Sequence, residues 1–105
     1  IIIIFSICVL FPTSSTANES SSGKLLFENN CAACHLNGGN IIRRGKNLKI
    51  STLKRKGLDN TEAIAEIARQ GIGIMSGYET KLGKGDDIEL AEWILSQAQN
   101  AWSQG

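Results

Sequence analysis

A short run of two cysteines and one histidine is the part of this chain best suited to chemistry. Cys31 and Cys34 are three positions apart, and His35 directly follows the second thiol. On one helical turn, the two sulfurs lie close enough to add to the two vinyl groups of one porphyrin, and the next side chain lies under its iron. The spacing therefore predicts one covalently attached haem c, held through thioethers at Cys31 and Cys34, with His35 as the proximal iron ligand.

Other uses of this motif fit the rest of the chain less well. A structural zinc site needs about four nitrogen or sulfur ligands, whereas His35 is the only histidine and the third cysteine, Cys8, lies in an apolar stretch. A thioredoxin-like pair needs a strand and a helix around the motif, and no alternating strand pattern flanks it. A simple disulfide between Cys31 and Cys34 stays open as an alternative, although it leaves the adjacent histidine without a role.

The only methionine of the chain, Met75, is the candidate for the second axial position. It lies in the glycine-rich segment 71–78, which is expected to be a loop, about 40 positions after His35. A single methionine usually fills space in a core. In a chain with haem c and one histidine, however, its thioether suits the distal iron position, and His/Met coordination raises the potential of the iron. The alternative is a five-coordinate or water-ligated iron.

The first 17 residues differ in composition from the rest. An apolar run from Ile1 to Phe11, too short to span a bilayer as a helix, precedes small residues that include Ser15 and Ala17. This pattern is typical of a secretory signal peptide that is cleaved after Ala17 and is truncated here at its start, although an uncleaved anchor is an alternative. Residues 18–105 are then one small haem domain, exported to a thylakoid lumen or a periplasm, where thioether attachment is completed.

Charge is unevenly distributed, although the formal net charge is only +1. The segment 41–57 carries seven basic residues and no acidic one, whereas the residues from Leu58 onward carry three basic and eight acidic ones. The resulting dipole suits transient docking to a charged partner, although solvated surface charge explains any single residue equally well. Nucleic acid is not an expected partner, because few aromatic residues interleave the basic segment. No pattern indicates an oligomer, and a monomer is expected.

Four segments are expected to be helical, from their apolar spacing and their end signals. They are residues 24–30, 51–56, 59–70 and 86–102. Asp59 with Glu62, and Asp86 with Glu89, are interpreted as capping boxes that begin the last two of these helices. Gly71 is expected to end the third helix.

The segment 36–48 is rich in glycine and asparagine and is expected to be a loop beside the haem. A backbone carbonyl near Arg44 is the expected acceptor for the second ring nitrogen of His35, a contact that would fix the ring and strengthen the ligand. Basic side chains of this loop are also suited to face the haem propionates.

Taken together, residues 23–102 resemble a class I c-type cytochrome and, within that class, cytochrome c6. The matching motifs are Gly23-x-x-x-Phe27, Cys31-Ala32-Ala33-Cys34-His35, Gly38-Gly39-Asn40, Gly71-x-Gly73-x-Met75, and Ala91-Glu92-Trp93 with Trp102. The resemblance implies an all-α class I cytochrome c fold, with about four helices around one covalently bound haem c. It also implies that the terminal helices cross at Gly23 and Phe27 against Trp93.

The same resemblance implies a soluble one-electron carrier rather than an enzyme. Such a carrier takes electrons from the cytochrome b6f complex, through cytochrome f, and passes them to photosystem I or to a terminal cytochrome oxidase. Two other functions stay open. One is a small haem peroxidase or gas sensor, which would need an open distal site, and the other is an assembly subunit in which haem is structural.

Three positions depart from the pattern of cytochrome c6. Ser76 stands where a proline commonly follows the axial methionine, and Arg44 stands where another proline is usual. Ile67 stands eight positions before Met75, where photosynthetic members often carry a glutamine beside the haem. Loss of that polar group changes the field at the iron. The departures favour the divergent c6-like branch and predict a lower potential, which would suit a carrier with other partners.

Overall fold

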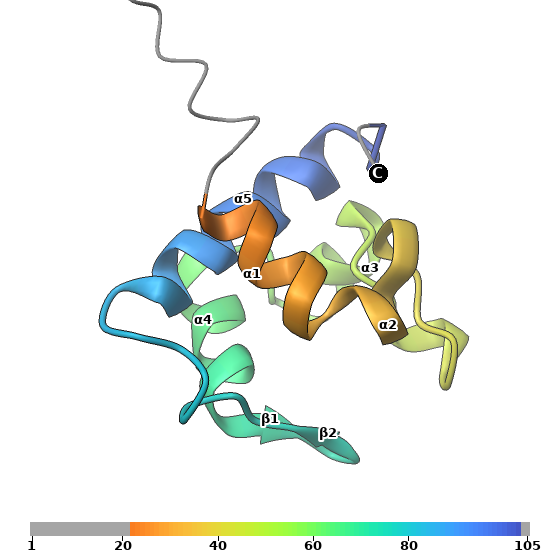
Figure 1. Ribbon diagram of the computed structural model, residues 1–105. Coiled ribbons are helices and arrows are strands. Elements are labelled where there is room, and N and C mark those ends of the chain that lie inside the picture. Colours follow the sequence, from red (N-terminus) through yellow and green to blue (C-terminus); the bar gives the residue numbers. More distant parts are fainter. Residues whose placement is uncertain (1–21, 104–105) are drawn as a thin grey trace, which may run out of the picture.

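The structure of this chain, a computed structural model, describes residues 22–103 (Figure 1). The signal peptide expected at residues 1–17 lies outside the described residues. The helices are α1 (Ser22–Asn30), α2 (Ala32–His35), α3 (Ile50–Arg55), α4 (Thr61–Gln70) and α5 (Asp86–Gln99), and the strands are β1 (Gly71–Ile72) and β2 (Met75–Ser76). Helices dominate these residues, in agreement with the expected all-α fold, because the two strands form only one very short hairpin.

The first and last helices cross where the sequence predicts. Gly23 and Phe27 are the buried residues of α1, and a methyl group at Gly23 would lie 2.6 Å from the Glu89 carbonyl oxygen and 2.8 Å from the Trp93 Cβ. Only glycine therefore allows this close approach of α1 to α5. The Phe27 ring covers the crossing, with its centroid 5.0 Å from that of Trp93. Figure 1 shows α1 lying across α5.

Helix α4 begins one residue later than the predicted capping box implies. Its N-cap is Asn60, whose Oδ1 accepts a hydrogen bond from the Ala63 backbone N–H at 2.8 Å. Asp59 is exposed and makes no cap, so the expected box of Asp59 and Glu62 is wrong. Asn60 is as good a cap as aspartate and holds the extended backbone that an N-cap requires. At the other end Gly71, with φ +77°, ends the helix as expected.

Helix α5 begins at Asp86 as the sequence predicts, but it is shorter than predicted at its C-terminal end. Gly85, with φ +84°, is its N-cap, and Asp86 turns back to accept a hydrogen bond from the Gly83 N–H at 2.7 Å. The predicted capping box of Asp86 and Glu89 is therefore wrong. The helix ends at Gln99, so Trp102 lies beyond it in a turn. The buried face of α5 includes Leu90, Ala91, Ile94 and Ala98.

The segment expected to be a glycine-rich loop after α4 is a β-hairpin. Its two strands are antiparallel and pair Gly71 with Ser76 and Ile72 with Met75. Gly73, with φ +57°, lies in the turn between the strands. The Tyr78 N–H then donates to the Ala68 carbonyl at 2.8 Å, so the hairpin is held against the end of α4. No helix within residues 22–103 is long and apolar enough to cross a membrane.

Candidate functional site

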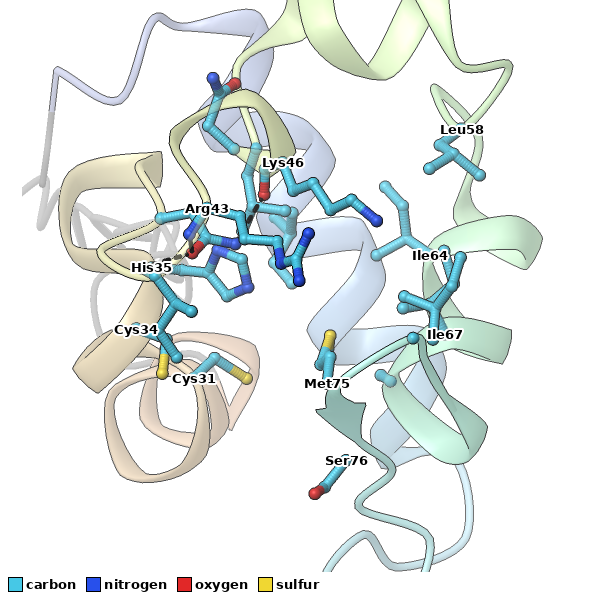
Figure 2. Close-up of a pocket in the computed structure, with 18 of the residues that line it drawn as sticks. Cys31, Cys34, His35, Arg43, Lys46, Leu58, Ile64, Ile67, Met75 and Ser76 are labelled. Atoms are coloured by element: carbon cyan, nitrogen blue, oxygen red, sulfur yellow. Dashed lines mark hydrogen bonds between the residues drawn. The ribbon is translucent and has the colours of Figure 1, made fainter.

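A cavity of about 540 Å³ opens between the N-terminal helices and α4. This volume falls in the range of roughly 300–1,000 Å³ that is usual for cofactor-sized sites. All four residues predicted to attach or ligate haem line it, although they come from separate elements: Cys31, Cys34 and His35 from the region of α2, and Met75 from β2. Figure 2 shows these four side chains around one space.

The two cysteines occupy one helical turn. The Cys31 N–H donates to the Phe27 carbonyl at 2.8 Å, and the His35 N–H donates to the Cys31 carbonyl at 2.9 Å, so α1 and α2 form almost one continuous helix through the motif. Both thiols are free and half-buried, so the alternative of a disulfide between them is not formed. Burial, with a further contribution from the adjacent Cys34, raises the pKa of the Cys31 thiol to about 11. Cys31 is therefore a neutral thiol at neutral pH.

His35 is buried and held in one orientation. Its Nδ1 lies 2.7 Å from the carbonyl oxygen of Gly39. Because a carbonyl can only accept, Nδ1 carries the proton, and the lone pair of Nε2 is free to bind a metal. In Figure 2 the His35 ring points toward the cavity.

The expectation that the acceptor for His35 would be a carbonyl near Arg44 is wrong. The backbone reverses directly after the histidine, at Asn37 with φ +54° and Gly38 with φ +78°. This reversal brings the carbonyl of Gly39 back under the ring, only four residues after His35.

Met75 approaches the cavity from the opposite side. It is half-buried in β2, and Figure 2 shows its sulfur pointing into the space that His35 faces. Its neighbour Ser76 pairs with Gly71 across the hairpin and also borders the cavity, farther from His35 in Figure 2 than Met75 is. The structure thus places the imidazole and the thioether on facing walls of one cavity, where both would be available to hold an iron-containing group.

The walls between these two side chains are apolar. Ile64 and Ile67 come from α4, Leu90 and Ile94 from α5, and Leu53 from α3. Ile67 therefore lines the cavity at the position where the resemblance places a polar residue in photosynthetic members. Such walls exclude water and favour a large planar apolar ring.

Two cations reach the cavity from the basic loop. Arg43 and Lys46 line it, and Figure 2 shows both side chains extending toward the space in front of His35. Their loop is clamped by Asn40, whose Oδ1 accepts from the N–H groups of Ile42 at 2.9 Å and Arg43 at 2.8 Å, while its Nδ2 donates to the Lys46 carbonyl at 3.0 Å. The sequence indicates basic residues facing propionates, but the clamp by Asn40 was not predicted. Its signal is an asparagine that begins an Asx turn.

These residues fit a covalently bound haem. Two free thiols, a nitrogen donor and a sulfur donor line one cavity, its walls are largely apolar, and Arg43 and Lys46 would be available to pair with anionic propionates.

Comparison with known proteins agrees with this site. The family model described as cytochrome c oxidase, cbb3-type, subunit III matches residues 18–94. The chain is 41% identical over 99 residues to a cytochrome c6-like protein of Nostoc sp. (strain PCC 7120 / SAG 25.82 / UTEX 2576), a match that covers 94% of this chain and 88% of the relative.

Solved structures of c-type cytochromes are also similar. Cytochrome c6B from Synechococcus sp. WH8102 is 70% identical, with a TM-score of 0.79 over 82% of this chain and 98% of that one. Cytochrome c6C from Synechococcus sp. PCC 7002 is 45% identical, with a TM-score of 0.73 over 76% of this chain and 98% of that one.

The fold and the cofactor expected from the sequence are thereby confirmed. The helices have the all-α class I cytochrome c arrangement of these neighbours, and the relatives are electron-transfer proteins rather than enzymes. The chain belongs to the cytochrome c6-like family of c-type cytochromes, which bind haem c covalently.

Proposed function

We propose that this chain is a one-electron carrier in which Cys31 and Cys34 hold haem c through thioethers, with His35 and Met75 as the axial ligands. When bound, the haem supplies an Fe(II)/Fe(III) couple. One observation carries the proposal: the His35 imidazole and the Met75 thioether face one apolar cavity from opposite walls.

The protein side chains have distinct tasks in such a carrier. The Gly39 carbonyl fixes the His35 ring and keeps the proton on Nδ1, so Nε2 stays available as a ligand. Met75 would be the second iron ligand and would close that position to small molecules. The apolar walls keep water out, so little solvent must reorganise when the charge of the site changes by one.

The rim of the cavity suits brief contact with a partner. Ile42, Ile72 and Ile74 line the cavity and are 62%, 53% and 66% exposed, respectively. Exposed apolar side chains beside the cations Arg43 and Lys46 favour transient docking of a membrane complex at the haem edge. We propose the cytochrome b6f complex as the donor, and photosystem I or a terminal oxidase as the acceptor, in the thylakoid lumen or the periplasm. The signal peptide that would direct this export remains a prediction.

A specific observation favours a low-potential carrier as the second candidate. Ile67 lines the cavity where a polar side chain is common in photosynthetic members, and Ser76 replaces the proline after Met75. Without a polar group beside the iron, the potential is expected below that of a photosystem donor, and the carrier would then serve other partners. A peroxidase or gas sensor is disfavoured, because Met75 would occupy the iron position that such a protein keeps open.

The test is a potentiometric titration of the visible spectrum of the haem-loaded protein, with Met75→Ala and the exposed control Thr80→Ala measured beside it. A reduction midpoint that falls steeply in Met75→Ala, but not in Thr80→Ala, supports His/Met ligation. The midpoint of the unaltered protein then distinguishes the two candidate carriers. A reduction midpoint that is unchanged in Met75→Ala contradicts the proposal. Rapid binding of carbon monoxide by the reduced native protein at neutral pH would show that the distal position is open.

A further inference from the structure

A tryptophan near the C-terminus has an unusual backbone and an unusual hydrogen bond. Trp102 lies in the turn after α5 and is only 7% exposed. Ala101 and Trp102 have φ values of +56° and +57°, a left-handed conformation that is unfavourable for residues other than glycine. Two such residues in succession persist only where contacts elsewhere determine the conformation.

Those contacts lie on the loop that follows the haem motif. The Trp102 indole Nε1–H donates to the Leu48 carbonyl at 3.0 Å, across 54 positions of sequence. The Leu48 N–H in turn donates to the Gly38 carbonyl at 2.7 Å. A methyl group at Gly38 would overlap the Trp102 ring, so the indole lies directly on the backbone of this glycine. Trp102 thus joins both ends of the loop 38–48 to the end of α5.

The same loop holds the axial histidine. Gly38 is followed by Gly39, whose carbonyl accepts the hydrogen bond from His35 Nδ1 at 2.7 Å. The Gly39 N–H donates to the Leu36 carbonyl at 3.0 Å, which closes the turn. The peptide groups next to the His35 acceptor are therefore fixed from one side by this turn and from the other by Leu48 and Trp102.

From this chain of contacts we infer that Trp102 is a positioning residue for His35: its indole holds Gly38 and Leu48, and so fixes the Gly39 carbonyl that orients the imidazole. This inference rests on the proposed role of His35 as an iron ligand. Hydrogen bonding from Nδ1 makes a ligating imidazole more basic. A loosened Gly39 carbonyl therefore makes His35 a weaker donor, which stabilises Fe(III) less and raises the reduction midpoint.

Trp93 is the matched comparison. Its ring belongs to the same aromatic cluster, 5.0 Å from the Phe27 centroid and 5.7 Å from that of Trp102. The Trp93 indole N–H, however, makes no hydrogen bond within residues 22–103, and its ring packs on the crossing of α1 and α5. A purely structural tryptophan in this cluster would behave like Trp93.

The experiment compares Trp102→Phe and Trp93→Phe in the haem-loaded full chain. Phenylalanine keeps an aromatic ring at either position, and only at position 102 does it remove a donor to the loop. NMR measures hydrogen exchange of the His35 Nδ1–H, and potentiometry measures the midpoint. We expect exchange at least about tenfold faster in Trp102→Phe than in Trp93→Phe, with a raised midpoint in Trp102→Phe alone. Equal exchange and equal midpoints in the two variants would overturn the inference.

A measurement on the unaltered protein covers the case in which Trp102→Phe does not fold. If the indole holds the loop, one opening of the loop exposes the Trp102 Nε1–H, the Leu48 N–H and the His35 Nδ1–H to exchange. Their hydrogen-exchange rates then show the same dependence on dilute urea. Independent exchange of the His35 proton contradicts the inference. If the unaltered protein shows no haem-shifted signal from the His35 ring, the ligation itself is wrong, and the positioning role is wrong with it. A haem-shifted His35 that does not respond to Trp102 leaves the proposed function intact.

Discussion

The two sides of the cavity are built in different ways. On the His35 side, the loop 38–48 is tied to the motif, to itself and to the C-terminal turn, through the hydrogen bonds from His35 Nδ1, the Leu48 N–H and the Trp102 indole. On the Met75 side, a hairpin of two-residue strands carries the thioether, and its neighbours Ile72 and Ile74 are exposed. The proposed ligand His35 is thus held by a braced loop, and the proposed ligand Met75 by a short hairpin. Substitutions that disturb the packing of the loop 38–48 should act mainly on stability, and substitutions beside Met75 mainly on the reduction midpoint.

The largest expected effect is that of Gly38→Ala on the His35 side. The residue has φ +78°, and its new methyl group would overlap the Trp102 ring. We expect a loss of about 3 kcal/mol in the free energy of unfolding, measured in urea, because backbone strain and overpacking add. Gly45→Ala in the same loop is the control: no atom lies within 4 Å of the added methyl, and the change should stay within about 0.5 kcal/mol. Equal losses in the two variants would show that the loop is not braced by Trp102.

Before haem is attached, the Cys31 thiol on the His35 side makes the free energy of unfolding depend on pH. Burial raises its pKa to about 11, so the folded chain holds this proton more tightly than the unfolded chain. The resulting stability is fully present below the unfolded pKa, near 9, and is lost as pH rises toward 11. Unfolding of the unloaded chain in urea at pH 8 to 11 should show a loss on the order of 2 kcal/mol.

Cys31→Ala is the control for this titration, because it removes the Cys31 thiol and leaves the other side chains unchanged. The variant should lose less stability over that pH range than the unaltered chain. The haem-loaded protein, whose Cys31 sulfur would be a thioether, should resemble the variant. Identical pH profiles for the variant and the unaltered chain before loading would exclude Cys31 as the titrating group.

On the Met75 side, Ile67→Gln should change the reduction midpoint of the haem more than the free energy of unfolding. Ile67 lines the cavity from α4, and an amide there restores a polar group beside the haem. We expect the reduction midpoint to rise by about 60 mV, which for a one-electron couple is roughly a tenfold change in the equilibrium constant. Ile67→Leu keeps the side chain apolar and should leave the midpoint in place. A midpoint that moves equally in both variants would attribute the effect to packing rather than to polarity.

The site was easier to predict from the sequence than the contacts that support it. Cys31, Cys34 and His35 are adjacent, so their spacing alone indicates the chemistry, and Met75 is the only thioether of the chain. The acceptor for His35 was predicted wrongly, because it depends on left-handed backbone at Asn37, and nothing in the local pattern requires an asparagine to adopt it.

Contacts between distant parts of the chain were harder still to predict. The Trp102 indole bonds to the Leu48 carbonyl, 54 positions away, and helical periodicity placed Trp102 inside α5 instead. The crossing of α1 and α5 at Gly23 was predicted correctly, because the resemblance to class I c-type cytochromes implies it.

The smallest expected effect concerns α4, the helix that leads into the Met75 hairpin, where sequence and structure assign the cap to different residues. Asn60 accepts the hydrogen bond from the Ala63 N–H, while Asp59 is exposed and outside the cap. Asn60→Ala should therefore cost about 1 kcal/mol in the free energy of unfolding, and Asp59→Ala no more than a few tenths. The loss should be accompanied by faster hydrogen exchange at the Ala63 N–H and by an unchanged His35 Nδ1–H, because α4 does not carry the brace around the histidine. The reverse order of the two losses would restore Asp59 as the cap. Faster exchange of the His35 Nδ1–H in Asn60→Ala would show that the two sides of the cavity are coupled. That result would contradict the view that the loop 38–48 and the Met75 hairpin are held independently.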